Sequence, residues 1–443
     1  MTAASVALTR LLASVEMARA YTLAVMLTIL GSFAIESMSG LPTLLAAEAA
    51  LCVIGVLILV VRREELTLLR LAPTTLLFFV VWALASALWS TGAGKSFQGW
   101  CALVGVAILA IVVGHIRDTL QTVRALGDAL RWMLAISLGM EIFSGLLIDM
   151  PITFLAIEGN LAFGGPLQGI FGSRNMLGFI AVIAVITFEV ERRTLSVPQA
   201  IAVPSVVLAG LLAVMSASPT VLVLAVAVGV ATIALSLVRR ADTATRPRWQ
   251  WTIAIVTTLG LIVAFVLRHP IIRMLDAGSD FSTRADLWNV LLDYWQKRPI
   301  HGWGWYGPWQ TGQYPLNAIN YFTDDRHASA LNAYFDTLLQ LGAAGLVLFL
   351  LLGGIALVRS WLVASIRRSI VYAWTPLVLV TLAVDSMFES FTLTGAGWFL
   401  LVLCALRAGQ SRSWRENIDA AQTGTITTLP PEENHYGGDG QGS

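Results

Sequence analysis

Long uninterrupted apolar runs are the dominant pattern of this chain. A helix needs about 20 predominantly apolar residues to cross the roughly 30 Å hydrocarbon core of a membrane. Runs near this length occur at 20–38, 42–61, 71–90, 99–116, 132–149, 175–190, 197–216, 219–238, 250–267, 338–358, 370–388 and 394–407. The sequence therefore predicts an all-α polytopic membrane protein with about 12 transmembrane helices.

The composition agrees with that class and excludes others. Hydrophobic residues make up 57% of the 443 residues and charged residues 12%, about half the charged share of a soluble protein. The formal net charge of +1 offers no basic field for nucleic acid, so no nucleic-acid partner is expected. Cys52, Cys101 and Cys404 lie in separate apolar runs, without the spacing of a metal site or a disulfide framework.

The basic residues predict an orientation in the membrane. Cytoplasmic loops carry an excess of Lys and Arg. With the N-terminus inside, only eight of the 28 basic residues fall on the outer side, namely Lys95, Arg174, Arg268, Arg273, Arg284, Lys297, Arg298 and Arg326. We therefore expect a multi-pass protein of the cytoplasmic (inner) membrane with both termini in the cytoplasm.

One predicted outer loop is far longer than the rest. It divides the chain into membrane spans 1–9 (1–267), an extracytoplasmic catalytic loop (268–337), spans 10–12 (338–410) and a polar, disordered cytoplasmic tail (411–443). Long ordered loops tend to carry function. We expect a short helix starting at Ser282 or Thr283 and ending before Pro299, and a second helix opening at Asp324–His327.

The motifs of this loop resemble the bacterial O-antigen ligase/polymerase family. The relevant strings are STRADLWNVLLDYWQKRPIHGWGW, with its RP-x-x-G-x-G turn, and RHASALNAYFDTLLQLGAAGLVLFLLL. A weaker similarity lies in GIFGSRNMLGFIA, residues 169–181. Two departures stand out: Pro219 replaces an arginine that the family often carries, and Asn332 follows His327 by five residues rather than directly.

The resemblance implies a membrane glycosyltransferase of surface polysaccharide and cell envelope assembly. Such an enzyme moves a glycan from a polyprenyl (undecaprenyl) diphosphate carrier to an acceptor hydroxyl on a lipid or another glycan, without cofactor or metal. A polymerase of the same family is the alternative. A transporter or flippase for an envelope precursor is a second alternative, because Asp385 and Glu389 are carboxylates four residues apart at the end of a span.

Roles for individual residues follow from the chemistry of such a transfer. A departing diphosphate favours the planar donor fork of arginine, and Arg284 is the first choice, with Arg174, Arg268, Arg273 and Arg326 in support. A hydroxyl acceptor needs a base, and His327, at a predicted helix start, is the first choice. Membrane lipids are expected partners around the helices. Weaker candidates for contacting the glycan or acceptor are Trp288, His301, Trp303, Trp305, Asp385 and Glu389.

Overall fold

The computed structural model describes residues 9–63, 71–242, 244–266, 278–310 and 312–422, and its side-chain description omits 261–266, 278–282 and 411–422. Regular structure in these ranges is helical, with a single isolated bridge between Ile152 and Ile157. The principal helices are α2 (Val15–Leu30), α3 (Ser32–Ser39), α4 (Leu41–Val61), α5 (Thr74–Ala85), α6 (Ala93–Ile116), α7 (Thr119–Ile142), α8 (Arg174–Thr194), α9 (Gln199–Met215), α10 (Pro219–Arg240), α11 (Arg246–Val266), α13 (Gly278–Gln296), α14 (Leu316–Phe322), α15 (Ala333–Ile366), α16 (Val371–Asp385) and α17 (Gly395–Gln422).

The helical class is confirmed, whereas the number of spans is not. Each of the predicted apolar runs falls on one or more of these helices. By length and composition, five helices of the described chain can cross a membrane, or six if α2 and α3, bent by 70° to each other, form one span. Several of the remaining apolar helices of the described chain are only 10–17 residues long, which is shorter than the sequence runs suggested.

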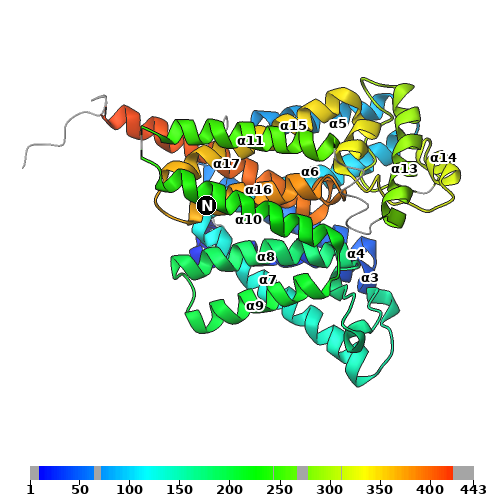
Figure 1. Cartoon of the computed structure of the whole chain (residues 1–443), viewed down its shortest axis with the longest axis horizontal. Coiled ribbons are helices and arrows are strands. Elements are labelled where there is room, and N and C mark those ends of the chain that lie inside the picture. The colour runs from blue at the N-terminus through cyan, green and yellow to red at the C-terminus, as the bar shows by residue number, and fades with distance from the viewer. Residues whose placement is uncertain (1–8, 64–70, 243, 267–277, 311, 423–443) are drawn as a thin grey trace, which may run out of the picture.

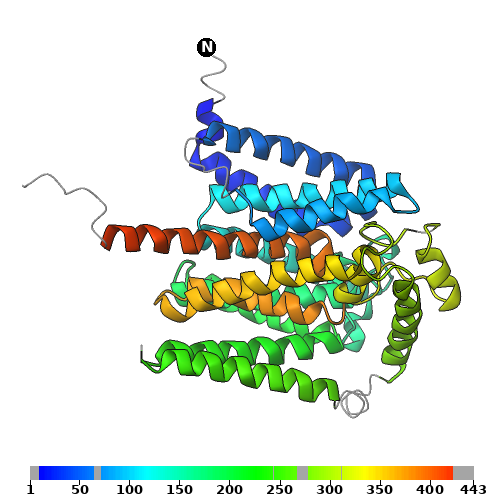
Figure 2. The same ribbon diagram turned by 90° about the horizontal axis from the view of Figure 1, so that it is seen from above.

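The long helices lie side by side in one bundle, and α13 and α14 lie across one end of it (Figures 1 and 2). At this end α8, α10 and α15 begin and α16 finishes, and we call it the site end. The other end, where α8 and α10 finish and α15 turns into α16, is called the far end. Arg192 and Arg193 of α8 and Arg239 and Arg240 of α10 occupy the last turns there.

Two glycine motifs of the sequence pack directly against each other at the site end. The amide nitrogens of Trp303 and Gly304 donate to the carbonyl oxygens of Leu339 (3.1 Å) and Gln340 (2.8 Å) in α15. A Cβ at Gly302, where φ is +66°, would lie 2.5 Å from the carbonyl oxygen of Gln340. A side chain cannot fit there, and the positive φ favours glycine as well. The RP-x-x-G-x-G turn is therefore docked on the LLQLG segment.

The second predicted loop helix differs from the structure. Residues 324–327 lie outside any helix: α14 ends at Phe322, Asp324 has a positive φ of 50°, and α15 starts only at Ala333. Asn332 is the true N-cap, because its side-chain oxygen accepts from the amides of Tyr334 (3.0 Å) and Phe335 (3.1 Å). The first loop helix, α13, ends at Gln296 before Pro299 as predicted but begins earlier, at Gly278.

Candidate functional site

A chain of polar side chains joins four separate elements at the site end. The Arg284 guanidinium of α13 forms an ion pair with Glu389 (Nη2 to Oε1, 3.1 Å), which follows α16. The same Glu389 oxygen accepts from Asn175 Nδ2 in the first turn of α8 (2.7 Å). Ser218, directly before α10, donates in turn to Asn175 Oδ1 (2.8 Å). We call Arg284, Glu389, Asn175 and Ser218 the polar chain.

Local sequence explains why Asn175 and Ser218 face each other. Ser173 caps α8 by accepting from the amide of Met176 (3.1 Å), which places Asn175 in the first helical turn. Pro219 occupies the first turn of α10, a position where its missing N–H costs nothing. Ser218 therefore stands at the N-cap of α10, and its hydroxyl bonds Asn175 instead of the helix. The family arginine replaced by Pro219 would follow this serine.

Strained backbone surrounds the polar chain. Ala217, before Ser218, has a φ of +46°, and Leu331, before the N-cap of α15, has a φ of +50°. Non-glycine residues rarely adopt this conformation, and such strain tends to persist at functional sites. The carbonyl of Leu331 accepts from Arg284 Nη1 (3.1 Å), and the carbonyl of Phe388 accepts from the same nitrogen. The strained Leu331 thus presents an oxygen that orients the arginine.

Among the described residues, the guanidinium of Arg284 is held by three hydrogen bonds and keeps two N–H donors unused. Its bonds to Leu331, Phe388 and Glu389 use three of the five N–H donors of an arginine. The side chain is 18% exposed and that of Glu389 is 6% exposed, so both partners are largely shielded from water. Burial raises the pKa of Glu389, and the adjacent Arg284 opposes that rise. The pair therefore holds the guanidinium in a fixed position, and we call Arg284 with its partners the anchor.

His327 lies near this anchor without helping to build it. Its side chain is buried, and Nε2 lies 3.7 Å from Asp325 Oδ2, while no hydrogen bond to Nε2 is found among the described residues. The Asn320 side chain holds the histidine backbone from both sides, accepting from its amide (3.3 Å) and donating to its carbonyl (3.2 Å). The backbone of His327 is therefore fixed by Asn320, and its buried Nε2 has no hydrogen-bond partner among the described residues.

Burial, rather than a helix terminus, sets the protonation of His327. The expected helix-start position is wrong because α15 begins six residues later, at Ala333. Desolvation lowers the pKa of His327 below its usual value, Asp325 acts to raise it, and the positive charge of Arg284 lowers it again. The imidazole is consequently neutral at neutral pH, as a general base requires.

The other arginines proposed for the donor are spread more widely. Arg174 is half-buried at the first position of α8, next to Asn175. Arg326 is exposed beside His327, and its amide donates to Asp325 Oδ1 (2.7 Å). Arg268 and Arg273 lie outside the described residues.

The tryptophans of the glycine segment are packed inside the protein. Trp303 and Trp305 are 6% and 1% exposed, and their indole N–H groups donate to the carbonyls of Tyr294 (3.1 Å) and Gly99 (3.3 Å). In this conformation neither ring is offered to a sugar. Trp288 and His301 are half-buried, so parts of their rings reach the surface.

The two carboxylates at the end of α16 occupy different surroundings. Glu389 belongs to the polar chain, whereas Asp385 is 0% exposed and neither of its oxygens has a hydrogen-bond partner within the described chain. The helical turn continues past the end of α16, because the amide of Glu389 donates to the carbonyl of Asp385 (2.9 Å), so the two residues are neighbours although their side chains have different partners. No group of three or more metal-ligating His, Cys, Asp or Glu side chains is found in the described ranges.

Sequence reasoning missed Asn175 and Ser218 as members of the site. The signal was present, because Asn175 lies in the segment GIFGSRNMLGFIA and Ser218 directly precedes Pro219, where the family often carries an arginine. Asn175 and Ser218 are 43 residues apart in sequence, and Asn175 and Glu389 are 214 apart. No local pattern indicates that the three side chains meet.

Loss of the Asn175 amide tests whether the polar chain matters for activity. Replacing Asn175 with leucine removes a hydrogen bond to a buried carboxylate, and such bonds contribute about 1.5–3 kcal/mol. We expect at least a tenfold fall in the turnover rate of the purified protein, measured in the same activity assay for the native protein and the variant. Asn160→Leu is the matched control, because Asn160 also donates to a glutamate, Glu158 (2.7 Å), but at an exposed position. Equal losses in both variants would contradict a role for the polar chain.

Comparison with protein families gives a match over part of the chain. Residues 204–350 match the O-antigen ligase family. The matched region runs from α9 through α13 to the first half of α15 and includes Ser218, Arg284 and His327. No curated protein matches the chain. The family match confirms the resemblance that the loop motifs indicated.

Proposed function

Because this chain carries an O-antigen ligase region and several membrane-span helices, we propose that it is a glycosyltransferase. It transfers a glycan from a polyprenyl diphosphate carrier to an acceptor hydroxyl on the outer face of the cytoplasmic membrane. The observation that carries this proposal is the pairing of a held, incompletely engaged arginine with a buried neutral histidine at one end of the bundle. A ligase acting on a distinct lipid or glycan acceptor is the form we propose, with the family's polymerase activity as the alternative.

The donor diphosphate is assigned to Arg284. The acceptor oxygen bonds to the anomeric carbon of the glycan while the bond from that carbon to the diphosphate oxygen breaks, and the electron pair leaves with the diphosphate. Negative charge therefore grows on the leaving group. A guanidinium fixed by Leu331, Phe388 and Glu389 meets this charge without reorganising. Proton uptake by Glu389, whose pKa is raised by burial, would further increase the net positive charge there.

The proton of the acceptor hydroxyl is assigned to His327. Its lowered pKa keeps the imidazole neutral, and its Nε2 is not hydrogen-bonded by the described residues. As the hydroxyl attacks, Nε2 takes the proton. Asp325, 3.7 Å away, then stabilises the imidazolium that forms. The exposed Arg326 and the half-buried Arg174 are proposed to support donor binding from the rim.

A transfer assay with purified full-length protein tests the function. The protein is incubated with a polyprenyl diphosphate glycan, with and without a separate lipid acceptor. Transfer to the separate acceptor supports the ligase, and a lengthened glycan on the carrier means a polymerase. Ion-driven movement of the lipid-linked glycan across a vesicle membrane without transfer would instead favour the transporter, in which the buried Asp385 would be the coupling group.

Site-directed labelling tests the proposed topology. Clusters of arginine at the far end, with the catalytic candidates at the site end, support an inside location for the far end. In a variant lacking Cys52, Cys101 and Cys404, a cysteine at Gly312 is expected to react with an impermeant thiol reagent on intact cells, and a cysteine at Thr243 only after lysis. Labelling of the Thr243 variant but not the Gly312 variant on intact cells would reverse the orientation.

A further inference from the structure

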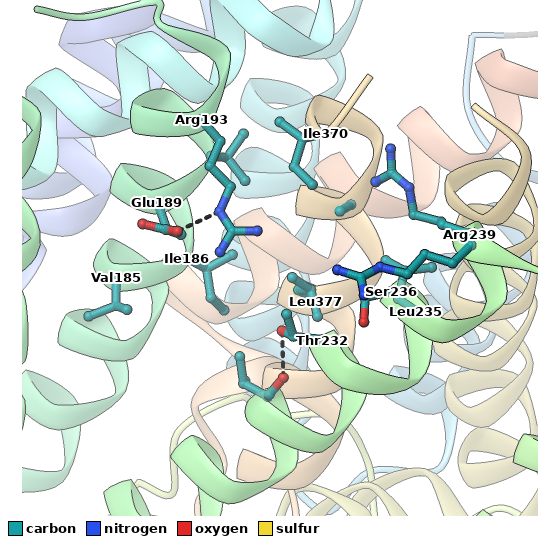
Figure 3. Close-up of a pocket in the computed structure, with 14 residues that line it drawn as sticks. Val185, Ile186, Glu189, Arg193, Thr232, Leu235, Ser236, Arg239, Ile370 and Leu377 are labelled. Carbon is teal, nitrogen blue, oxygen red and sulfur yellow. Dashed lines mark hydrogen bonds and ion pairs between the residues drawn. The ribbon is translucent and has the colours of Figure 1, made fainter. Parts of the chain in front are cut away.

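A pocket with apolar walls and a basic rim lies at the far end of the bundle. Its volume is about 360 Å³, and it is formed by α8, α10 and the beginning of α16. Apolar side chains line its depth, among them Val185, Ile186, Val228, Leu235 and Leu377. Figure 3 shows Arg193 of α8 and Arg239 of α10 on opposite sides of the pocket. The proposed glycosyltransferase reaction uses none of these residues.

The rim of the pocket keeps a positive charge. Arg193, Arg239 and Arg240 line it, and Glu189 is the acidic residue of the lining. Glu189 is already shared, because it pairs with Arg192 (2.7 Å) and with Arg193 (2.5 Å). One carboxylate therefore serves two arginines, and the charges of Arg239 and Arg240 are not balanced by it.

Arg239 carries a buried donor group that pairs with none of the described residues. Its Nη2 donates to the carbonyl oxygens of Arg367 (3.0 Å) and Arg368, which hold the guanidinium at the turn between α15 and α16. Its Nη1 is buried and has no hydrogen-bond partner in the described part of the chain. Unsatisfied buried donors are rare in proteins, and one on a fixed guanidinium is suited to an anion.

We propose that this pocket binds an anionic phospholipid, with its phosphate on Arg239, Arg193 and Arg240 and an acyl chain between α8, α10 and α16. A free anion would need only the rim. The lining on α10 continues from Arg239 back to Val228, and at 1.5 Å per helical residue this is about 16 Å of depth. Basic pockets between membrane helices commonly bind anionic headgroups. The membrane leaflet that supplies the lipid depends on the proposed topology, whereas the proposal that the pocket binds the lipid does not.

Lipid binding to the purified full-length protein in detergent is the direct test. Phosphatidylglycerol and phosphatidylcholine with identical acyl chains are compared by native mass spectrometry and by thermal unfolding. We expect phosphatidylglycerol to remain bound and to raise the melting temperature, because it would join three helices. Phosphatidylcholine, whose headgroup has no net charge, should do neither at the same concentration. Equal retention of the two lipids would overturn the proposal.

Variants separate the rim from the walls. The double change Arg193→Gln and Arg240→Gln removes two rim charges and should weaken phosphatidylglycerol binding by about 30-fold. Arg248→Gln is the matched control, because Arg248 is an exposed arginine near the same end that does not line the pocket. A comparable loss in the control variant would mean that only general surface charge attracts the lipid.

Filling the apolar walls distinguishes a lipid from a soluble anion. Val228→Trp reduces the space for an acyl chain and leaves all the arginines in place, so we expect phosphatidylglycerol binding to be lost. Inorganic phosphate is titrated in parallel and should not raise the melting temperature of the native protein. Protection by inorganic phosphate equal to that by phosphatidylglycerol, or unchanged lipid binding by a folded Val228→Trp variant, would overturn the proposal. None of these readouts depends on glycan transfer.

Discussion

Replacing Arg284 with lysine is expected to weaken binding of the polyprenyl diphosphate donor by about 10- to 100-fold, the loss of one or two charge-assisted hydrogen bonds. Lysine keeps the positive charge but has a single ammonium group in place of a planar fork. It cannot reach the carbonyls of Leu331 and Phe388, the carboxylate of Glu389 and a phosphate together. Donor affinity and single-turnover transfer are measured on the same preparation.

The arginine experiment has two comparison variants. Arg248→Lys changes an exposed arginine away from the polar chain and should leave donor affinity unchanged. Arg326→Lys tests the exposed arginine beside His327, where we expect a smaller loss than at position 284 because an exposed ion pair contributes little. If Arg326→Lys loses affinity and Arg284→Lys does not, the diphosphate contact belongs to Arg326 and the assignment of the anchor is wrong.

His327→Ala is expected to slow transfer by about 10²–10⁴-fold, the usual contribution of a general base, with donor affinity nearly unchanged. Loss of rate without loss of binding separates this variant from Arg284→Lys. His301→Ala is the control, because His301 is half-buried in the glycine segment and its ring contacts Trp89. If both histidine variants transfer at the native rate, neither histidine is the base. If His301→Ala is inactive while His327→Ala is active, His301 is the base instead.

The pH dependence gives an independent measurement on the same residue. A base must be neutral, and burial lowers the pKa of His327 below its usual value of 6.5. Transfer should therefore fall to half its maximum at a pH below 6.5, as the imidazole becomes protonated. Asp325 acts to raise this pKa, so Asp325→Asn should move the decline to still lower pH. Asp324→Asn, a change of the exposed neighbour, should leave the profile in place, and an unmoved profile in Asp325→Asn would argue against His327 as the titrating group.

Positions of the helices were largely predictable from the sequence. The apolar runs coincide with helices because backbone groups in hydrocarbon must be satisfied within their own segment, so a long apolar run is compatible with little else. The number of spans was harder to predict. Bends and short helices, such as the 70° angle between α2 and α3, depend on how neighbours pack rather than on hydrophobicity.

The start of the second loop helix could not be predicted from hydrophobic periodicity, because more than one residue in the loop is a suitable N-cap. Asp324 and Asn332 are both acceptable N-cap types. The helix begins after Asn332, whose side chain also donates to the carbonyl of Met387 (2.9 Å) in the segment after α16. That contact is 55 residues away in sequence. The N-cap residue that the structure uses is thus also the one that makes a tertiary hydrogen bond. Because the helix begins only after Asn332, His327 lies in an irregular segment.

By itself, the sequence determined the helical membrane class, the similarity of residues 204–350 to the O-antigen ligase family, and the choice of Arg284 and His327 as the residues to test. Only the tertiary structure decided which side chains surround Arg284 and which aromatics are available. Asn175, Ser218 and Glu389 meet because three helix ends converge at the site end. Trp303 and Trp305 are core residues because the glycine turn that carries them docks on α15. Burial and long-range pairing arise from packing between distant segments, whereas the hydrophobic pattern records only the local preference of each segment.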